Sequence, residues 1–68
     1  GRSDISIETP DYVYIIEIKK DESADAALSQ IVEKAYDRRY ADDSRKVFKI
    51  GISFSTRFRG IEEWKVAD

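Results

Sequence analysis

Two acidic residues and a lysine near the start of the sequence have the types and spacing of a phosphodiester-cleaving site. Glu17 and Lys19 close the apolar run 12–19, whose β-branched and aromatic residues predict a buried β-strand. Side chains two residues apart in a strand point to the same face, so the carboxylate and the ammonium lie on one side. Because burying a charge is costly unless it is paired or binds a metal, this strand end is the first place to look for chemistry.

Asp4 brings a second carboxylate to the same place. It begins the alternating stretch 4–8, which a Thr-Pro-Asp turn connects to the longer strand, and this arrangement predicts an antiparallel hairpin. If Glu8 pairs with Val13, Asp4 lies opposite Glu17 and the three charged groups share one face. The other face then carries an apolar layer of Ile5, Ile7, Tyr14, Ile16 and Ile18. A slip of one residue would mix the two sets, so the hydrophobic pattern favours this register.

Two carboxylates and an amine at the ends of neighbouring strands suit Mg²⁺-dependent hydrolysis of phosphodiesters. Mg²⁺ takes oxygen ligands, keeps several waters and is usually held by one or two carboxylates together with phosphate oxygens. The metal would lower the pKa of a bound water, and the lysine would orient that water or the developing charge. The alternative is a plain ion pair between Glu17 and Lys19 at an exposed strand end, worth about 0–1 kcal/mol.

These residues resemble the Asp…Glu-x-Lys signature of the PD-(D/E)xK nuclease superfamily. The chain further resembles a nuclease-like domain of Bacteroides-type gut bacteria that lies C-terminal to an ATPase-like domain. That likeness extends over residues 7–14, 27–36, 45–52 and 63–65. It implies that Asp4 and Glu17 bind Mg²⁺ or Mn²⁺, that the backbone carbonyl of Ile18 completes the protein ligands, and that Lys19 positions the attacking water.

The resemblance also implies a role for the helix that follows and for elements ahead of Asp4. In several branches of the superfamily a Gln on this helix, followed by a Tyr, lies near the metal. Gln30 and Tyr36 would take these places at a wider spacing, or they are a solvated Gln and a core-flanking Tyr. The superfamily core usually begins with a further helix and strand, so we expect residues 1–68 to form a single, partial domain with a truncated restriction-endonuclease-like core.

The remaining pattern predicts the elements that position the site. Apolar residues at helical spacing predict an amphipathic helix over residues 23–37. Residues 47–54 alternate as a strand that a right-handed crossover places parallel to the Glu17 strand, and residues 61–66 predict an antiparallel edge strand. The fold class is therefore α/β, with a mixed four-stranded sheet, in the order β-hairpin, helix, strand, strand, and one helix packed on it.

Several single residues outside this pattern have two interpretations. Residues 37–46 read as a loop whose Arg38, Arg39, Tyr40, Arg45 and Lys46 contact phosphates or are simply solvated. Lys49 is a second cation of the site or faces solvent. Gly51 indicates a close approach or a bulge, and we assign Trp64 to the core rather than to a base-stacking surface.

Composition limits the classes of function. The 68 residues include no Cys, which excludes disulfides and zinc–thiolate sites, and no His, which removes the usual general base. A net charge of −2 is a poor electrostatic footprint for a nucleic-acid binder, although a bound cation or a neighbouring domain would offset it. Since the longest apolar run is too short to span a bilayer, we expect no membrane association and a cytoplasmic location.

The sequence therefore predicts metal-dependent hydrolysis of phosphodiester bonds in nucleic acid, with DNA rather than RNA as the substrate. The chain would be a Mg²⁺-dependent endonuclease or phosphodiesterase if it is active. The alternative is a catalytically inactive nuclease-like module that binds nucleic acid or another protein and assists an ATPase-like domain. Because one long helix leaves one face of the sheet uncovered, we also expect a homodimer or an upstream ATPase-like domain as partner.

Overall fold

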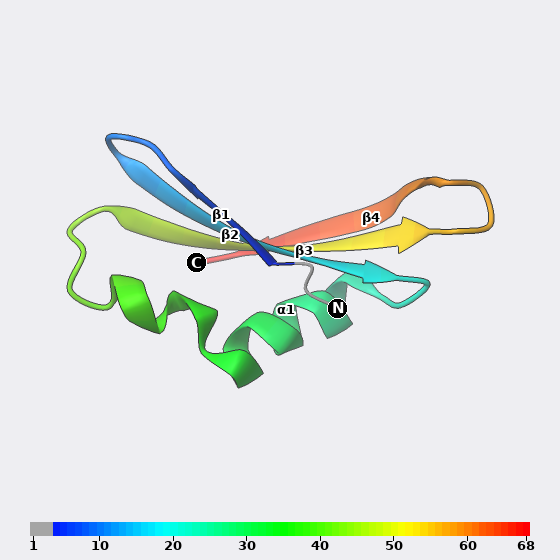
Figure 1. Cartoon of the computed structure of the whole chain (residues 1–68), viewed down its shortest axis with the longest axis horizontal. Helices are drawn as coiled ribbons and strands as arrows, with labels where there is room; N and C mark the ends of the chain where they lie inside the picture. The colour runs from blue at the N-terminus through cyan, green and yellow to red at the C-terminus, as the bar shows by residue number, and fades with distance from the viewer. Residues whose placement is uncertain (1–3) are drawn as a thin grey trace.

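The computed structural model describes residues 4–68 and confirms the predicted order of elements (Figure 1). Residues 1–3 lie outside the described residues. The elements are strands β1 (Asp4–Glu8) and β2 (Tyr12–Lys20), helix α1 (Ala24–Lys34), the short 3₁₀ helix η1 (Tyr36–Tyr40), and strands β3 (Lys46–Ser55) and β4 (Gly60–Ala67).

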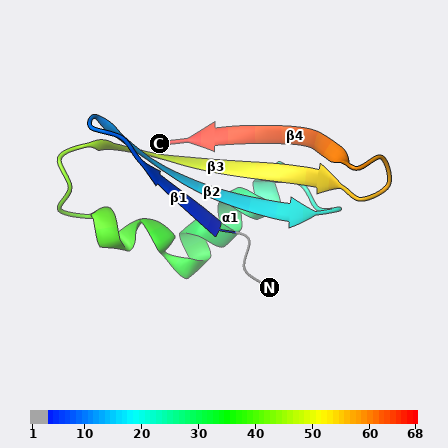
Figure 2. The same cartoon turned by 45° about the horizontal axis from the view of Figure 1, so that its top comes forward.

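The four strands form one mixed sheet in the order β1-β2-β3-β4. The outer pairs β1–β2 and β3–β4 are antiparallel, and the central pair β2–β3 is parallel, as a crossover through α1 requires. Helix α1 packs against β2, β3 and β4 on one face, and Figure 2 shows the other face without a helix in front of it. The predicted fold class and the central place of the Glu17 strand are confirmed.

The start of α1 was readable from the sequence, whereas its end was not. The Ser23 hydroxyl accepts a hydrogen bond from the Ala26 N–H at 3.0 Å and caps the first turn. Ala35 adopts left-handed angles, φ 53° and ψ 42°, and ends the helix at Lys34, three residues before the predicted end at residue 37. The segment expected to be part helix and part loop forms η1 instead. The chain gives no glycine or asparagine signal for this ending.

Gly51 lets α1 approach the sheet closely. A Cβ atom at this position would lie 2.4 Å from the carbonyl oxygen of Ala24 and 2.9 Å from the backbone nitrogen of Leu28. The close approach predicted for Gly51 is therefore confirmed, and the bulge lies elsewhere, between Ser53 and Phe54. The core between helix and sheet is made by Val13, Ile15, Ala24, Ala27, Ile31 and Tyr40.

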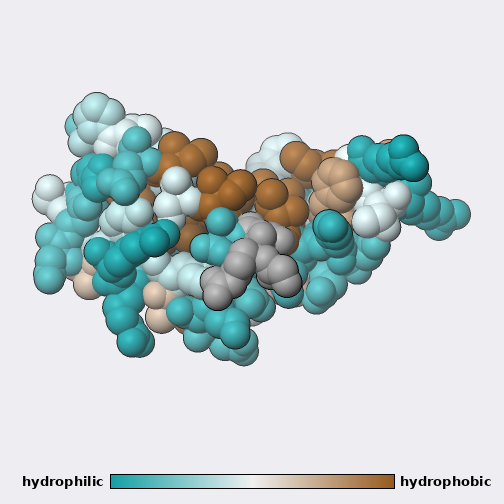
Figure 3. Space-filling model, in the orientation of Figure 1, coloured by the Kyte–Doolittle hydropathy of each residue, from teal (hydrophilic) through white to brown (hydrophobic). Residues whose placement is uncertain are grey.

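The apolar layer predicted for the hairpin lies on the face that α1 leaves open. Ile5 and Ile7 are each 46% exposed, and Trp64, which we had assigned to the core, is 67% exposed. That assignment was wrong because Trp64 pairs with Ile52 on the open face, whereas its neighbours Glu63 and Lys65 point to the other face and contact α1. Figure 3 shows brown, apolar side chains along the side of the sheet away from α1. The helix therefore packs on the face of β2 that carries Glu17 and leaves the apolar face of the hairpin open.

An ion-pair cluster joins the hairpin turn to the start of β3. The guanidinium of Arg45 lies 2.9 Å from Glu8 and 2.6 Å from Asp43, and it also donates to the Thr9 carbonyl. Its hydrogen bonds lower the pKa of Asp43 to about 2 and also lower the pKa of Glu8. Tyr40 donates to the same Glu8 carboxylate at 3.2 Å. This cluster fixes η1 beside β1, on the face where the site was predicted.

Candidate functional site

The two predicted carboxylates stand side by side. Asp4 of β1 is the direct partner of Glu17 of β2, which confirms the register derived from the hydrophobic pattern. Directly opposite residues in an antiparallel pair have Cβ atoms about 4.5–5.5 Å apart and point to the same face. Glu17 is 5% exposed and Asp4 is half-buried, both on the face that α1 covers. An exposed ion pair at a strand end, the plain alternative, does not describe a Glu17 this deeply buried.

Lys19 lies on the same face as Glu17, one pleat further along β2. Its ammonium is 3.8 Å from the carboxylate of Glu22, in the turn that leads into α1, and its side chain is 26% exposed. Across the sheet Lys19 pairs with Ser53, and Ser53 pairs with Glu63. The amine therefore sits between the buried Glu17 and an acidic edge at the carboxyl ends of β2 and β3.

The other two predicted site residues are Ile18 and Gln30. The side chain of Ile18 points to the open face, where Ile52 is its strand partner, so only its backbone is available to the site. Gln30 is half-buried on α1, and within residues 4–68 it makes no hydrogen bond to Asp4 or Lys19. Tyr36, at the start of η1, lines a hollow together with Asp4. The structure thus brings Tyr36 next to the first carboxylate.

The hollow beside Asp4 has basic and aromatic walls. Its volume is about 500 Å³, and it is lined by Asp4, Ala35, Tyr36, Arg38 and Arg39. The Arg39 guanidinium donates a hydrogen bond to the Ser6 hydroxyl of β1 and lies 5.3 Å from the centroid of the Tyr40 ring. Because Asp4 and Ser6 share a face, this arginine is held directly beside the first carboxylate.

The other cations considered as phosphate ligands have carboxylate partners. Arg45 is held by Glu8 and Asp43 as described above. Lys46 lies 2.7 Å from Asp68, and Lys49 lies 3.4 Å from Asp37. A phosphate would have to displace these carboxylates, so the prediction that Arg45 and Lys46 contact phosphates is not supported. Lys49 is on the site face but is neutralised there.

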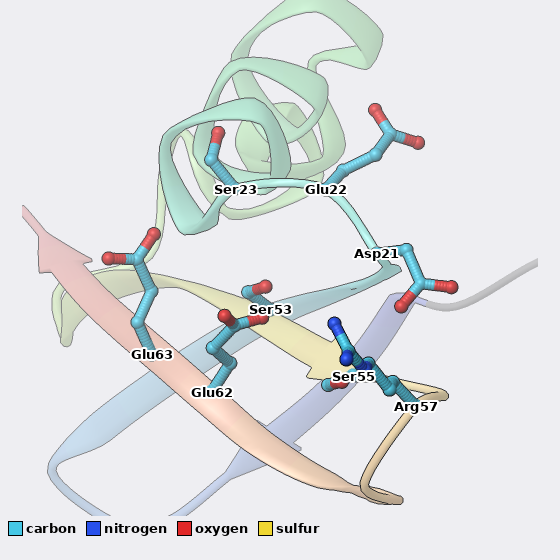
Figure 4. A pocket seen from close by; sticks show the side chains of 8 residues that line it. All are labelled: Asp21, Glu22, Ser23, Ser53, Ser55, Arg57, Glu62 and Glu63. Carbon is cyan, nitrogen blue, oxygen red and sulfur yellow. The ribbon is translucent and has the colours of Figure 1, made fainter.

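A second hollow lies where β2 and β3 end and α1 begins (Figure 4). Its volume is about 540 Å³, and its lining is Asp21, Glu22, Ser23, Ser53, Ser55, Arg57, Glu62 and Glu63. The Glu63 carboxylate accepts from the Ala24 N–H at 3.0 Å, and Asp21 accepts two hydrogen bonds from Thr56 that lower its pKa. The sequence predicted residues 61–66 as an edge strand without placing its acids at a hollow, and the bulge in its pairing with β3 turns Glu63 toward the start of α1.

Asp4 and Glu17 are the acidic side chains that could hold a divalent metal at this site. Within residues 4–68 no group of three or more acidic side chains is close enough to hold a metal ion. Asp4 and Glu17 form a pair, and a pair of carboxylates fits the way proteins hold Mg²⁺, which keeps several of its waters. In the same residues no helix is long and apolar enough to cross a membrane.

A mixed sheet with this crossover, an Asp opposite a Glu, and a Lys two residues beyond the Glu together define a nuclease-like α/β module. A family profile described as the PD-(D/E)XK nuclease superfamily matches residues 1–64, so the chain belongs to this superfamily. Searches of curated proteins and of solved structures gave no match to the chain. Nucleases of this superfamily typically use divalent metals.

Proposed function

We propose that the chain is a metal-dependent nuclease module that hydrolyses phosphodiester bonds in DNA. The observation that carries this proposal is the direct pairing of Asp4 with Glu17 on the face that also holds Lys19. A slip of one residue in the hairpin would place Asp4 on the opposite face of the sheet from Glu17 and Lys19. Membership of the superfamily supports the same chemistry.

Each residue has a distinct role in this proposal. The carboxylates of Asp4 and Glu17 and the carbonyl of Ile18 would hold Mg²⁺ or Mn²⁺, which supplies an acidified water and polarises the phosphoryl group. Lys19 would hold the attacking water and stabilise the charge that develops on the phosphate oxygens. The burial of Glu17 keeps bulk water from its carboxylate, where electrostatic interactions are stronger than in solution. Gln30 remains a candidate for contact with substrate from α1.

Titration with Mg²⁺ and with Mn²⁺, followed by NMR, tests the metal site. We expect selective shifts of the amide resonances of Asp4, Glu17 and Lys19 with Mg²⁺, and line broadening at the same residues with Mn²⁺. Asp4→Asn should weaken this response about tenfold or more, because one of two charged ligands is lost. Asp11→Asn, in the exposed hairpin turn, is the matched control and should leave the response unchanged. Spectra that do not respond to either metal would contradict the proposal.

The alternative function is a nuclease-like module without activity that binds nucleic acid or protein beside an ATPase-like domain. The acidic net charge and the partnership of Lys19 with Glu22 favour it. Cleavage of supercoiled plasmid and of single-stranded DNA in Mn²⁺ separates the two functions. Cleavage of either substrate that requires Asp4 and Glu17 supports the nuclease, and both substrates left intact in the presence of metal binding support the inactive module.

We also propose that the open apolar face is covered by a second copy of the chain or by an attached domain. Ile5, Ile7 and Trp64 lie on this face at 46–67% exposure, which is costly for a chain of this size. The isolated chain should sediment as a dimer, and Trp64→Arg should shift it to monomer. Val32→Arg changes an equally exposed apolar residue on α1 and should leave the dimer intact. A monomer at all concentrations would contradict the dimer.

A further inference from the structure

The hollow beside Asp4 indicates whether the substrate is single-stranded or double-stranded, and this inference rests on the nuclease function proposed above. Its volume of about 500 Å³ lies within the range of about 300–1,000 Å³ typical of pockets for small molecules. A hollow of this size accepts a group as large as a nucleotide, whereas a double helix would contact only its rim. The hollow adjoins the first carboxylate, so whatever occupies it is next to the proposed metal.

The charges of the chain direct a phosphate to this hollow. Within residues 4–68 the lysines and arginines outside the ion pairs are Lys20, Lys34, Arg38, Arg39, Arg57 and Arg59. Arg38 and Arg39 both line the hollow beside Asp4. Arg39 is already oriented by Ser6 and the Tyr40 ring, so little further ordering is needed for it to bind an anion. Arg38 is exposed and takes part in no ion pair of the described chain.

The other hollow has the opposite character. Four of its lining residues, Asp21, Glu22, Glu62 and Glu63, are acidic and only Arg57 is basic. Carboxylates repel phosphate, so this hollow disfavours the nucleic-acid backbone. In a chain with a net charge of −2, the position of the few available cations therefore decides where a strand can bind.

Tyr36 adds an aromatic wall to the hollow beside Asp4. It is half-buried and packs against the core, so its ring is fixed before any ligand arrives. Bases of single strands stack on fixed aromatic side chains irrespective of their sequence, and arginines hold the adjoining phosphates. A base inside a duplex is already stacked and cannot reach such a ring without leaving the helix.

We propose that this hollow binds one nucleotide of an unpaired strand, with its phosphate on Arg38 and Arg39 and its base against Tyr36. The strand then passes Asp4, so the nuclease acts on single-stranded DNA, on a frayed end or on a gap rather than on an intact duplex. Tyr36, Arg38 and Arg39 are substrate-binding residues in this arrangement. Arg39 binds the phosphate, and its hydrogen bond to Ser6 of β1 orients it before the strand arrives.

Fluorescence anisotropy with a labelled oligo-dT, measured in EDTA at several salt concentrations, tests the proposal. Arg38→Gln should weaken binding about tenfold, since one charge-assisted hydrogen bond is lost. It should also lower the slope of log affinity against log salt by about 0.7. Arg38→Lys should recover most of the affinity because the positive charge remains. Arg57→Gln removes an arginine from the acidic hollow instead, and should change affinity by less than about twofold.

Each outcome bears on one proposal separately, because binding is measured without a divalent ion. An equal effect of Arg38→Gln and Arg57→Gln would overturn the assignment of the hollow. Binding of a duplex of the same length as tightly as oligo-dT would overturn the preference for an unpaired strand. Binding that depends on Arg38, together with single-stranded DNA left intact in Mn²⁺, would overturn the nuclease function alone.

Discussion

Lys19→Met is expected to slow Mn²⁺-dependent cleavage of DNA by about 100-fold or more while leaving metal binding unchanged. The ammonium of Lys19 is the group proposed to stabilise charge on the phosphate oxygens, and removal of one such preorganised donor typically costs about 10²–10³ in rate. The carboxylates proposed to hold the metal are Glu17, one pleat away on β2, and its partner Asp4 on β1, so the same variant should retain the NMR response to Mg²⁺. A loss of rate without a loss of metal separates catalysis from ligand binding.

Lys20→Met is the matched control for this experiment. Lys20 is the next residue of β2, is exposed, and pairs with Phe54, so its side chain points to the open face. Both variants lose one positive charge, and only one of them loses it on the site face. Rates that fall equally in the two variants would show that the loss of positive charge weakens DNA binding in general. That result would contradict a catalytic role for Lys19.

The partnership of Lys19 with Glu22 allows a second, finer comparison. Their charged atoms are 3.8 Å apart and both side chains are partly exposed, so the pair contributes little to stability. Glu22→Gln should therefore leave the fold intact and release the ammonium toward Glu17. We expect cleavage by this variant to be equal to or faster than that of the parent chain. Slower cleavage would mean that Glu22 orients the Lys19 ammonium and is itself a positioning residue.

The sequence predicted the charged face of the hairpin because two independent signals agreed there. Alternation along β1 places Ile5 and Ile7 on one face and Asp4 on the other. The register that also groups these isoleucines with the apolar residues of β2 pairs Asp4 with Glu17, and that register is the observed one. Strand and helix starts were equally readable, since Ser23 is a local capping signal. Such features depend on neighbours in sequence, so pattern alone can find them.

The features that the sequence missed all depend on contacts between distant segments. The basic hollow exists because the left-handed Ala35 redirects the chain and Arg45 fixes the following segment beside Glu8. The acidic hollow exists because a bulge in the β3–β4 pairing brings Glu63 to the N-terminus of α1. The exposure of Trp64 follows from a sheet face that no described helix covers. None of these contacts has a local signature, and each changes which charges a substrate would meet.

Gly51→Ala is expected to destabilise the domain by about 3 kcal/mol, the upper part of the range for overpacked cores. The added methyl group would lie 2.4 Å from the carbonyl oxygen of Ala24 and 2.9 Å from the Leu28 nitrogen. Both atoms belong to the backbone of α1, so no side-chain rotation can relieve the contact and the whole helix must move away from β3. A domain of this size rarely has more than about 3–5 kcal/mol of stability in total. The variant should therefore be largely unfolded at temperatures where the parent chain is folded.

Gly60→Ala supplies the control, because it makes the same chemical change at a site with room to adjust. Its added Cβ would meet only the exposed ring of Phe58, at 3.2 Å, and that ring can turn aside. Urea unfolding followed by circular dichroism should give a midpoint close to that of the parent for Gly60→Ala and a much lower one for Gly51→Ala. Equal midpoints would show that α1 does not press on β3 as the structure has it. Since Ser53 and Ser55 of β3 and the N-cap Ser23 of α1 line the acidic hollow, a helix displaced by the added methyl group would also change the shape of that hollow.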